Sequence, residues 1–171
     1  MRKLIFAFIS MLFIFQFTNI IITRELGAEY VTIYNVTYKI FSIMIVAVTI
    51  LLNPVWSAFT DAYTKNDYEW MRKCLKRIEK MGIMTVPVII LLLLLSEFIF
   101  DIWLGGKVET NIHLTICMAV YAICQIMSQV YMYPLNGMGK VRLQLFVYLF
   151  FAVVAIPGII YFTRKWGIVG T

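Results

Sequence analysis

The sequence predicts an all-α integral membrane protein with about five transmembrane helices, and its composition and charge distribution both support this class. Of the 171 residues, 62% are hydrophobic and only 14% are charged. A soluble domain is typically about half apolar and about a quarter charged, and disordered chains are more polar still. The composition therefore excludes a soluble domain and a disordered chain. The net charge of +6 comes from basic residues between the apolar runs, which we interpret as determinants of membrane topology and not as a nucleic-acid-binding surface.

Apolar runs long enough to cross a bilayer follow one another along the chain, since a spanning helix needs ~20 residues. The five runs are Leu4–Thr23, Val31–Phe59, Ile83–Leu104, Ile112–Pro134 and Leu143–Phe162. Between the second and third runs, residues 64–81 place apolar side chains at helical spacing beside a basic face. We expect this amphipathic segment to lie on the cytoplasmic surface of the membrane, or alternatively to extend the third span.

Lys and Arg residues are distributed unevenly between the runs. One side of the membrane would hold ten of the fifteen, namely two at the N-terminus, six in residues 60–82 and two in residues 136–142. The other side would hold four, which are Arg24, Lys107, Arg164 and Lys165. The positive-inside rule therefore predicts a multi-pass protein of the cytoplasmic (inner) membrane, with its N-terminus in the cytoplasm and its C-terminus outside.

Lys39 is the cation that interrupts the second run, about nine residues from its start. A lysine at membrane depth costs ~3 kcal/mol or more unless it is paired, solvated or able to snorkel. Asn35 lies one helical turn earlier and shares its face. Two interpretations are open: Lys39 meets an anionic substrate in a water-filled cavity, or it snorkels or pairs with Glu25 or Glu29.

Amide side chains in the other runs also have two interpretations. The first run contains Gln16 and Asn19, and the fourth contains Gln125, Ser128 and Gln129 on one helical face. Such groups hydrogen-bond between membrane helices or line a substrate cavity. We expect mainly packing, with Gln16, Asn19 and Gln125 as candidate substrate ligands.

Two proline positions predict bends. Pro54 lies near the end of the second run, where proline forms either a gate-like bend or a helix end. Pro157-Gly158 lies inside the fifth run and predicts a kink. We therefore expect Pro54, Pro157 and Gly158 to be hinge positions.

Catalytic and metal-binding motifs are absent from the sequence. It has no Gly-x-Ser-x-Gly, no phosphate-binding glycine loop and no His-Glu-x-x-His. Cys74, Cys117 and Cys124 lack metal-ligand spacing, and His113 has no second ligand nearby. We expect no enzyme activity, no cofactor and no metal.

Short motifs in a fixed order resemble a transporter family. They are Leu26-Gly27, Tyr38-Lys39-Ile40-Phe41, Pro54-x-Trp56-Ser57-Ala58, Asp61-Ala62-Tyr63 and Asp67-Tyr68-x-Trp70, then Trp103-Leu104-Gly105 and Leu135-Asn136-Gly137-x-Gly139-Lys140. In order and spacing they resemble the polysaccharide-exporter (O-antigen flippase) branch of the multidrug/oligosaccharidyl-lipid/polysaccharide exporter superfamily. The resemblance extends over about 120 residues and implies an exporter built from two six-helix bundles around a central cavity.

In that family the five runs resemble part of the second six-helix bundle, roughly its seventh to eleventh spans. We therefore expect a chain truncated at both ends, with the missing N-terminal half as a partner. The implied activity is export of a polyprenyl-diphosphate-linked glycan by alternating access. Lys39 would meet the diphosphate, and Asn35, Gln16, Asn19 and Gln125 would bind sugar or headgroup.

Two alternatives remain open. A non-transporting membrane subunit or remnant would only dock to partners within the bilayer, which a half-length chain supports. A cation-coupled drug exporter of the same superfamily would usually have an acidic residue deep in a span. Here the carboxylates lie at the ends of runs or between them, which counts against that activity.

Overall fold

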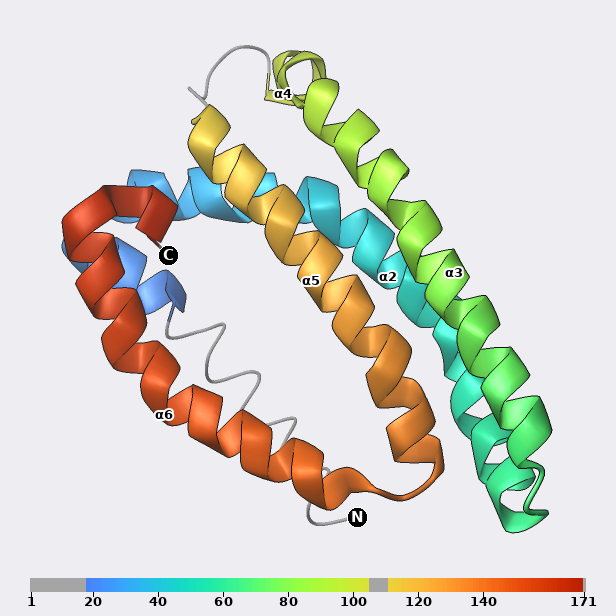
Figure 1. Cartoon of the computed structure of the whole chain (residues 1–171). Helices are drawn as coiled ribbons and strands as arrows, with labels where there is room; N and C mark the ends of the chain where they lie inside the picture. Colours follow the sequence, from blue (N-terminus) through green and yellow to red (C-terminus); the bar gives the residue numbers. More distant parts are fainter. Residues whose placement is uncertain (1–17, 105–110, 171) are drawn as a thin grey trace. The chain divides into compact units, whose positions relative to one another are not determined.

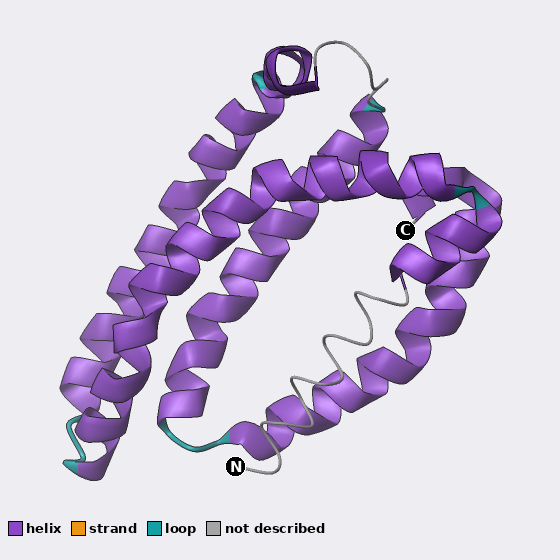
Figure 2. Ribbon diagram, turned by 180° about the vertical axis from the view of Figure 1, so that it is seen from behind, coloured by secondary structure: helices purple, strands orange, loops and turns teal. Residues whose placement is uncertain are grey.

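The structure is a computed structural model that describes residues 18–104 and 111–170, without the side chains at positions 103–104, 141–145, 148–149, 152–153 and 156. Residues 18–25 are helical. The later elements are α2 (Ala28–Thr64), α3 (Tyr68–Leu94), α4 (Ser96–Leu104), α5 (Ile112–Gly137), α6 (Val141–Trp166) and a short 3-10 helix, η1 (Gly167–Gly170) (Figure 1). No strand occurs in these residues (Figure 2), which confirms the all-α class.

Two of the described helices, α2 and α5, are long and apolar enough to cross a membrane alone. A third candidate span combines α3 with α4, which meet at a 55° bend. The described residues thus contain two or three candidate spans, whereas the sequence contains five apolar runs. Most of the first run, Leu4–Thr23, lies outside the described residues, and α6 contains the fifth run.

The boundaries of α3 show how local sequence shapes the helices. Asp67 caps its N-terminus, because the Asp67 carboxylate accepts a hydrogen bond from the Trp70 backbone N–H at 3.0 Å. From Tyr68 the helix continues without interruption to Leu94. Most of the amphipathic segment 64–81 therefore belongs to the same helix as the first part of the third apolar run.

The chain forms two compact units, and α2 contributes to both. Unit 1 contains Met1–Val36 and Arg142–Thr171, and unit 2 contains Thr37–Val141. The core of unit 2 is made by fully buried aliphatic and aromatic side chains of α2, α3 and α5: Phe41, Val48, Leu52, Ile89, Ala122, Ile126 and Val130.

Helix directions within unit 2 follow from its contacts. Thr49 and Asn53 on α2 contact Gln129 and Tyr133 on α5, so residue numbers rise together and the two helices run parallel. Helix α3 follows α2 and precedes α5 in the sequence, and it runs in the opposite direction to both (Figure 1). Three consecutive candidate spans therefore alternate in direction.

Candidate functional site

The motifs near residues 54–70 and 135–140 meet at one end of unit 2, which we call the motif end. The Lys140 ammonium lies 5.9 Å from the centre of the Tyr63 ring. The rings of Phe59 and Trp70 contact edge to face at 5.7 Å. These pairs join the end of α2 to the start of α3 and to the turn that follows α5. The motifs therefore build one packed structure from segments far apart in sequence.

Gly137 brings α5 into close contact with α2 at the motif end. The Thr60 hydroxyl donates a hydrogen bond to the Gly137 carbonyl at 2.9 Å. A Cβ atom on Gly137 would lie only 2.7 Å from both the Phe59 Cβ and the Trp56 carbonyl oxygen. Small residues allow such close approach of membrane helices. Glycine at this position therefore has a packing role.

Two side-chain hydrogen bonds continue this contact along the two helices. The Thr49 hydroxyl donates to the Gln129 amide oxygen at 3.0 Å. The Tyr133 hydroxyl donates to the Asn53 amide oxygen at 3.1 Å. Together with the Thr60–Gly137 bond they form what we call the α2–α5 seam. Gln129 thus takes part in helix packing, one of the two roles considered for the amides of this run.

Gln125 lies on α5 one turn before Gln129 and is half-buried. Its side chain makes no hydrogen bond to any other residue in the described part of the chain. Its role as a substrate ligand stays a prediction.

Lys39 is exposed and is one of the residues that line a groove of about 300 Å³, which we call the Lys39 groove. The other lining residues come from α2, α3 and α4 and are all apolar: Ile40, Ile43, Met44, Val88, Leu92 and Ile99. Within residues 18–104 and 111–170 the Lys39 ammonium has no hydrogen-bond or ion-pair partner. The surface of the groove is therefore hydrocarbon-like.

In unit 1 two of the predicted ligands lie together. The Asn35 amide donates a hydrogen bond to the Asn19 amide oxygen at 3.3 Å, which is longer than the usual 2.7–3.2 Å. The contact joins the helix of residues 18–25 to the start of α2. Gln16 lies outside the described residues.

An ion pair that sequence reasoning missed also lies in unit 1. The Arg164 guanidinium donates two hydrogen bonds to the Glu25 carboxylate, at 3.0 and 2.8 Å. These hydrogen bonds and the positive charge hold the pKa of Glu25 below its ordinary value of 4.5. Glu25 was a possible partner for Lys39, and the structure gives it Arg164 instead. No local pattern signals a pair separated by 139 residues.

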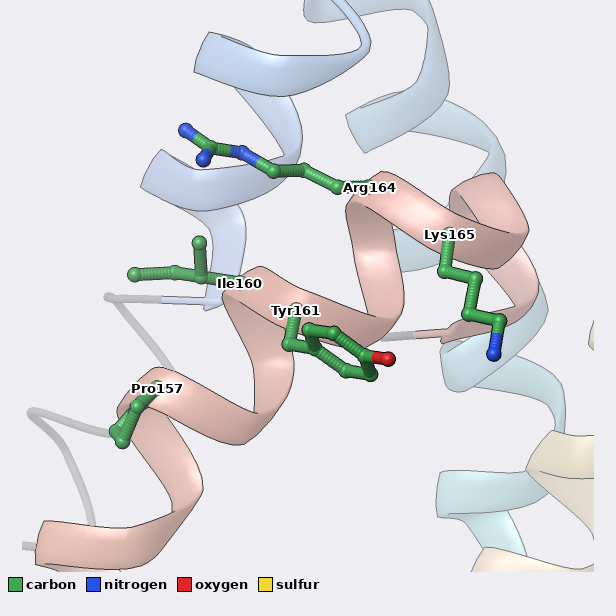
Figure 3. Close-up of a pocket in the computed structure, with 5 residues that line it drawn as sticks. All are labelled: Pro157, Ile160, Tyr161, Arg164 and Lys165. Carbon is green, nitrogen blue, oxygen red and sulfur yellow. The ribbon is translucent and has the colours of Figure 1, made fainter.

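An open cavity of about 590 Å³ borders α6 close to this ion pair, lined by Pro157, Ile160, Tyr161, Arg164 and Lys165 (Figure 3). Arg164 extends toward the helix of residues 18–25, and Lys165 extends to the other side of α6. The Lys165 ammonium lies 5.5 Å from the Trp166 ring and 5.9 Å from the Tyr161 ring. Each cation already has a partner, so neither provides a free charge.

The predicted hinges lie inside continuous helices. Helix α2 continues past Pro54 to Thr64, so Pro54 does not end the helix. Helix α6 likewise continues past Pro157 and Gly158. Bending at these three positions stays a prediction.

Comparison with known protein families gives a match over more than half of the chain. The family described as "Polysaccharide biosynthesis protein" matches residues 2–112. This range includes the motifs from Leu26 to Gly105 but not the motif at residues 135–140. No curated protein and no solved structure matches the chain.

Proposed function

Because the chain belongs to the polysaccharide biosynthesis protein family, we propose that it exports lipid-linked oligosaccharide or polysaccharide repeat units across the cytoplasmic membrane. The family match over residues 2–112 carries this proposal. Apolar helices of spanning length place the chain among membrane proteins, where such export takes place. Alternating access would move the unit across, with these helices as part of one bundle.

The chemistry of the substrate requires a cation within the membrane. A diphosphate carries negative charge that hydrocarbon cannot solvate, so its path must offer cations and hydrogen-bond donors. Lys39 is our candidate for the diphosphate, because it lies on a candidate span and its ammonium has no partner among the described residues. Asn35, Asn19 and Gln125, together with Gln16, are candidates for sugar and headgroup.

Alternating access also requires rigid groups of helices that move against one another. The α2–α5 seam supports one such rigid group, since its polar and close-packed contacts hold two spans together. Pro54 and Pro157-Gly158 are the positions at which we expect helices to bend. A kink at proline is permitted because the i−4 hydrogen bond is already missing there.

Substitution of Lys39 tests the proposal in cells that depend on this chain for surface polysaccharide. Lys39→Ala should reduce export of the glycan by about tenfold without lowering membrane abundance, and Lys39→Arg should recover part of it. Lys65→Ala is the matched control, because Lys65 is exposed and paired with Asp61 at the surface. Unchanged export in Lys39→Ala would remove Lys39 from the mechanism.

Deletion of the chain separates this function from the alternative of a non-transporting subunit. An exporter predicts that lipid-linked repeat units accumulate on the cytoplasmic face after deletion. A docking subunit predicts that loss of the chain destabilises a partner, while Lys39→Ala has no effect on export.

Reporter fusions test the proposed orientation. A reporter fused after Thr171 should be active only outside the cytoplasm, and one inserted within residues 65–80 only inside it. The motif end would then face the cytoplasm. A cytoplasmic signal from the C-terminal reporter would contradict this orientation.

A further inference from the structure

The N-terminal half of α3 presents exposed cations on one face of the helix, which we call the basic face. They are Arg72, Lys73, Lys76, Arg77 and Lys80. At 3.6 residues per turn these five positions fall within an arc of about 140°. The opposite side of the same turns contains Met71, Ile78 and Gly82, which are buried in unit 2. The basic face therefore points away from the rest of the unit.

The acidic residues of α3 leave most of this charge unpaired. Glu69 forms an ion pair with Lys73 at 2.6 Å. Glu79 is half-buried and interacts instead with the Tyr131 hydroxyl on α5. Within residues 18–104 and 111–170, the other four cations of the basic face have no ion-pair partner.

The spacing of the cations makes them repel one another. Arg72, Lys76 and Lys80 follow at intervals of four residues, as do Lys73 and Arg77. Like charges at this spacing destabilise a helix, since the side chains are neighbours on its surface. Anions from outside the chain would relieve this repulsion.

The same face of α3 becomes apolar directly after Lys80. No cation follows Lys80 in the helix, and the exposed residues in the continuation of the arc include Ile83, Met84, Leu91 and Leu94. Helix α3 is uninterrupted through this change and forms a candidate span together with α4 (Figure 1). The helix therefore enters the hydrocarbon within about one turn, between Lys80 and Ile83.

This boundary sets the height of each cation above the hydrocarbon. At about 1.5 Å per residue, Lys80 lies about 4.5 Å from Ile83 along the helix axis, Arg77 and Lys76 about 9–10.5 Å, and Arg72 about 16 Å. The headgroup layer is about 5–7 Å thick on each side of a bilayer. Lys80 thus lies within this layer, and long Lys and Arg side chains at the next two positions can reach it.

We propose that the basic face binds anionic phospholipid headgroups of the adjoining leaflet, with Lys80, Arg77 and Lys76 as the contacting cations. Headgroups already surround the helix next to Ile83, whereas an acidic soluble protein would have to displace them to reach Lys80. Clusters of basic residues next to a spanning helix attract anionic lipids in this way. The bound lipids would hold the motif end of unit 2 at a fixed height. The inference depends neither on the proposed export function nor on the orientation of the chain.

Photoreactive lipids test the inference on the whole chain in nanodiscs. Phosphatidylglycerol and phosphatidylcholine, each with the same photoreactive acyl chain, are compared by their labelling of the peptide that contains Ile83 and Met84. We expect phosphatidylglycerol to label it at least about fivefold more. At Ile50, an exposed α2 residue with no cation between residues 40 and 60, the two lipids should label equally.

Single substitutions should follow the height of each cation. Lys80→Gln should reduce the preference for phosphatidylglycerol by about fivefold, and Lys80→Arg should keep it. Arg72→Gln should reduce it by less than about twofold, because that cation lies beyond the headgroups. Lys65→Gln is the matched control: it removes the same charge near the start of α3, but Lys65 is paired with Asp61. A salt concentration of about 1 M should suppress the preference.

Three outcomes would overturn the inference, with circular dichroism confirming that the variants are folded. Equal labelling by both lipids at Ile83 and Met84 would exclude selective headgroup binding. Equal losses in Lys80→Gln, Arg72→Gln and Lys65→Gln would show a general effect of net charge and no site at the boundary. Equal labelling by both lipids, together with Lys80-dependent binding of polyglutamate, would assign the basic face to an acidic protein.

Discussion

Two faces of α2 in unit 2 differ in whether their polar side chains have partners on neighbouring helices. On the face toward α5, the hydroxyl and amide groups of the seam have partners on the neighbouring helix, and Gly137 lets the backbones approach. On the face toward α3 and α4, Lys39 borders an aliphatic groove without a partner among the described residues. Partnered polar groups hold membrane helices together, whereas an unpartnered one is available to a ligand.

The motif Tyr38-Lys39-Ile40-Phe41 serves both faces within four residues. The Tyr38 ring lies 6.2 Å from that of Tyr121 on α5, and Phe41 is buried in the core. Lys39 and Ile40 line the groove. This motif, which contributes to the resemblance to the family, therefore mixes packing residues with candidate ligands, and resemblance alone does not separate them.

The largest effect should come from breaking the seam with Gly137→Leu. Its Cβ would overlap the Phe59 side chain and the α2 backbone, neither of which can move without separating the helices. Overpacking of this kind should lower the free energy of unfolding by about 3 kcal/mol. Denaturant titration of the whole chain in bicelles measures this loss.

Substitutions of two other helical glycines are controls for Gly137→Leu. A Cβ on Gly82 would meet only the ends of the Val130 and Met127 side chains, so Gly82→Ala should be milder. A Cβ on Gly158 would meet nothing within 4 Å, so Gly158→Ala should be near neutral. Equal losses at all three positions would show that close approach at Gly137 is not what stabilises the seam.

On the face of α2 toward α3 and α4, Lys39→Leu should stabilise the chain instead of destabilising it. Removing an ammonium that no described residue pairs should raise the free energy of unfolding by about 1–2 kcal/mol. This gain is smaller than the cost of ~3 kcal/mol for a lysine at the centre of a membrane helix, because an exposed side chain can partly snorkel. The same bicelle titration measures it, with Lys65→Leu as the control at an exposed surface ion pair. A large destabilisation by Lys39→Leu would mean that Lys39 serves packing.

Hydropathy predicted where two long apolar helices occur but not where a helix breaks. The runs Val31–Phe59 and Ile112–Pro134 lie within α2 and α5, because apolar length marks the residues that leave water. The break after Leu94 has no such signal, since it falls within consecutive leucines and not at Pro87. Ser96 donates to the Leu93 carbonyl at 2.7 Å at that break, a contact that only the folded chain reveals.

The sequence was enough to predict which residues are candidates for the site, but not which residues they contact in the folded chain. Lys39, Asn35 and Asn19 are conspicuous because polar groups are costly in an apolar run. Their surroundings depend on helices brought together by folding, so neither the aliphatic wall beside Lys39 nor the Arg164–Glu25 pair could be derived from spacing.

A smaller effect is expected from a single hydrogen bond of the seam. Tyr133→Phe removes the donor to Asn53 but keeps the ring against Trp56, whose centre lies 6.3 Å away. Interhelical hydrogen bonds in membranes average about 0.6 kcal/mol, so we expect a loss of that size. A double-mutant cycle with Asn53→Ala should give a coupling energy of the same size. A coupling near zero would leave close packing as the sole source of seam stability.

The smallest effect, and one that depends on pH, is expected from the ion pair of unit 1. Since the pKa of folded Glu25 lies below 4.5, its stabilisation is complete above pH 4.5 and disappears as the pH falls through the lowered pKa. The Arg164 side chain is 64% exposed, so solvent and salt screen the pair. Glu25→Gln should therefore lower the unfolding midpoint slightly at neutral pH and not at all in strong acid, with Glu29→Gln as the control. The seam has no titrating group in this range, so an equal acid dependence of the Tyr133→Phe effect would show that protonation loosens the whole chain and not the Glu25–Arg164 pair.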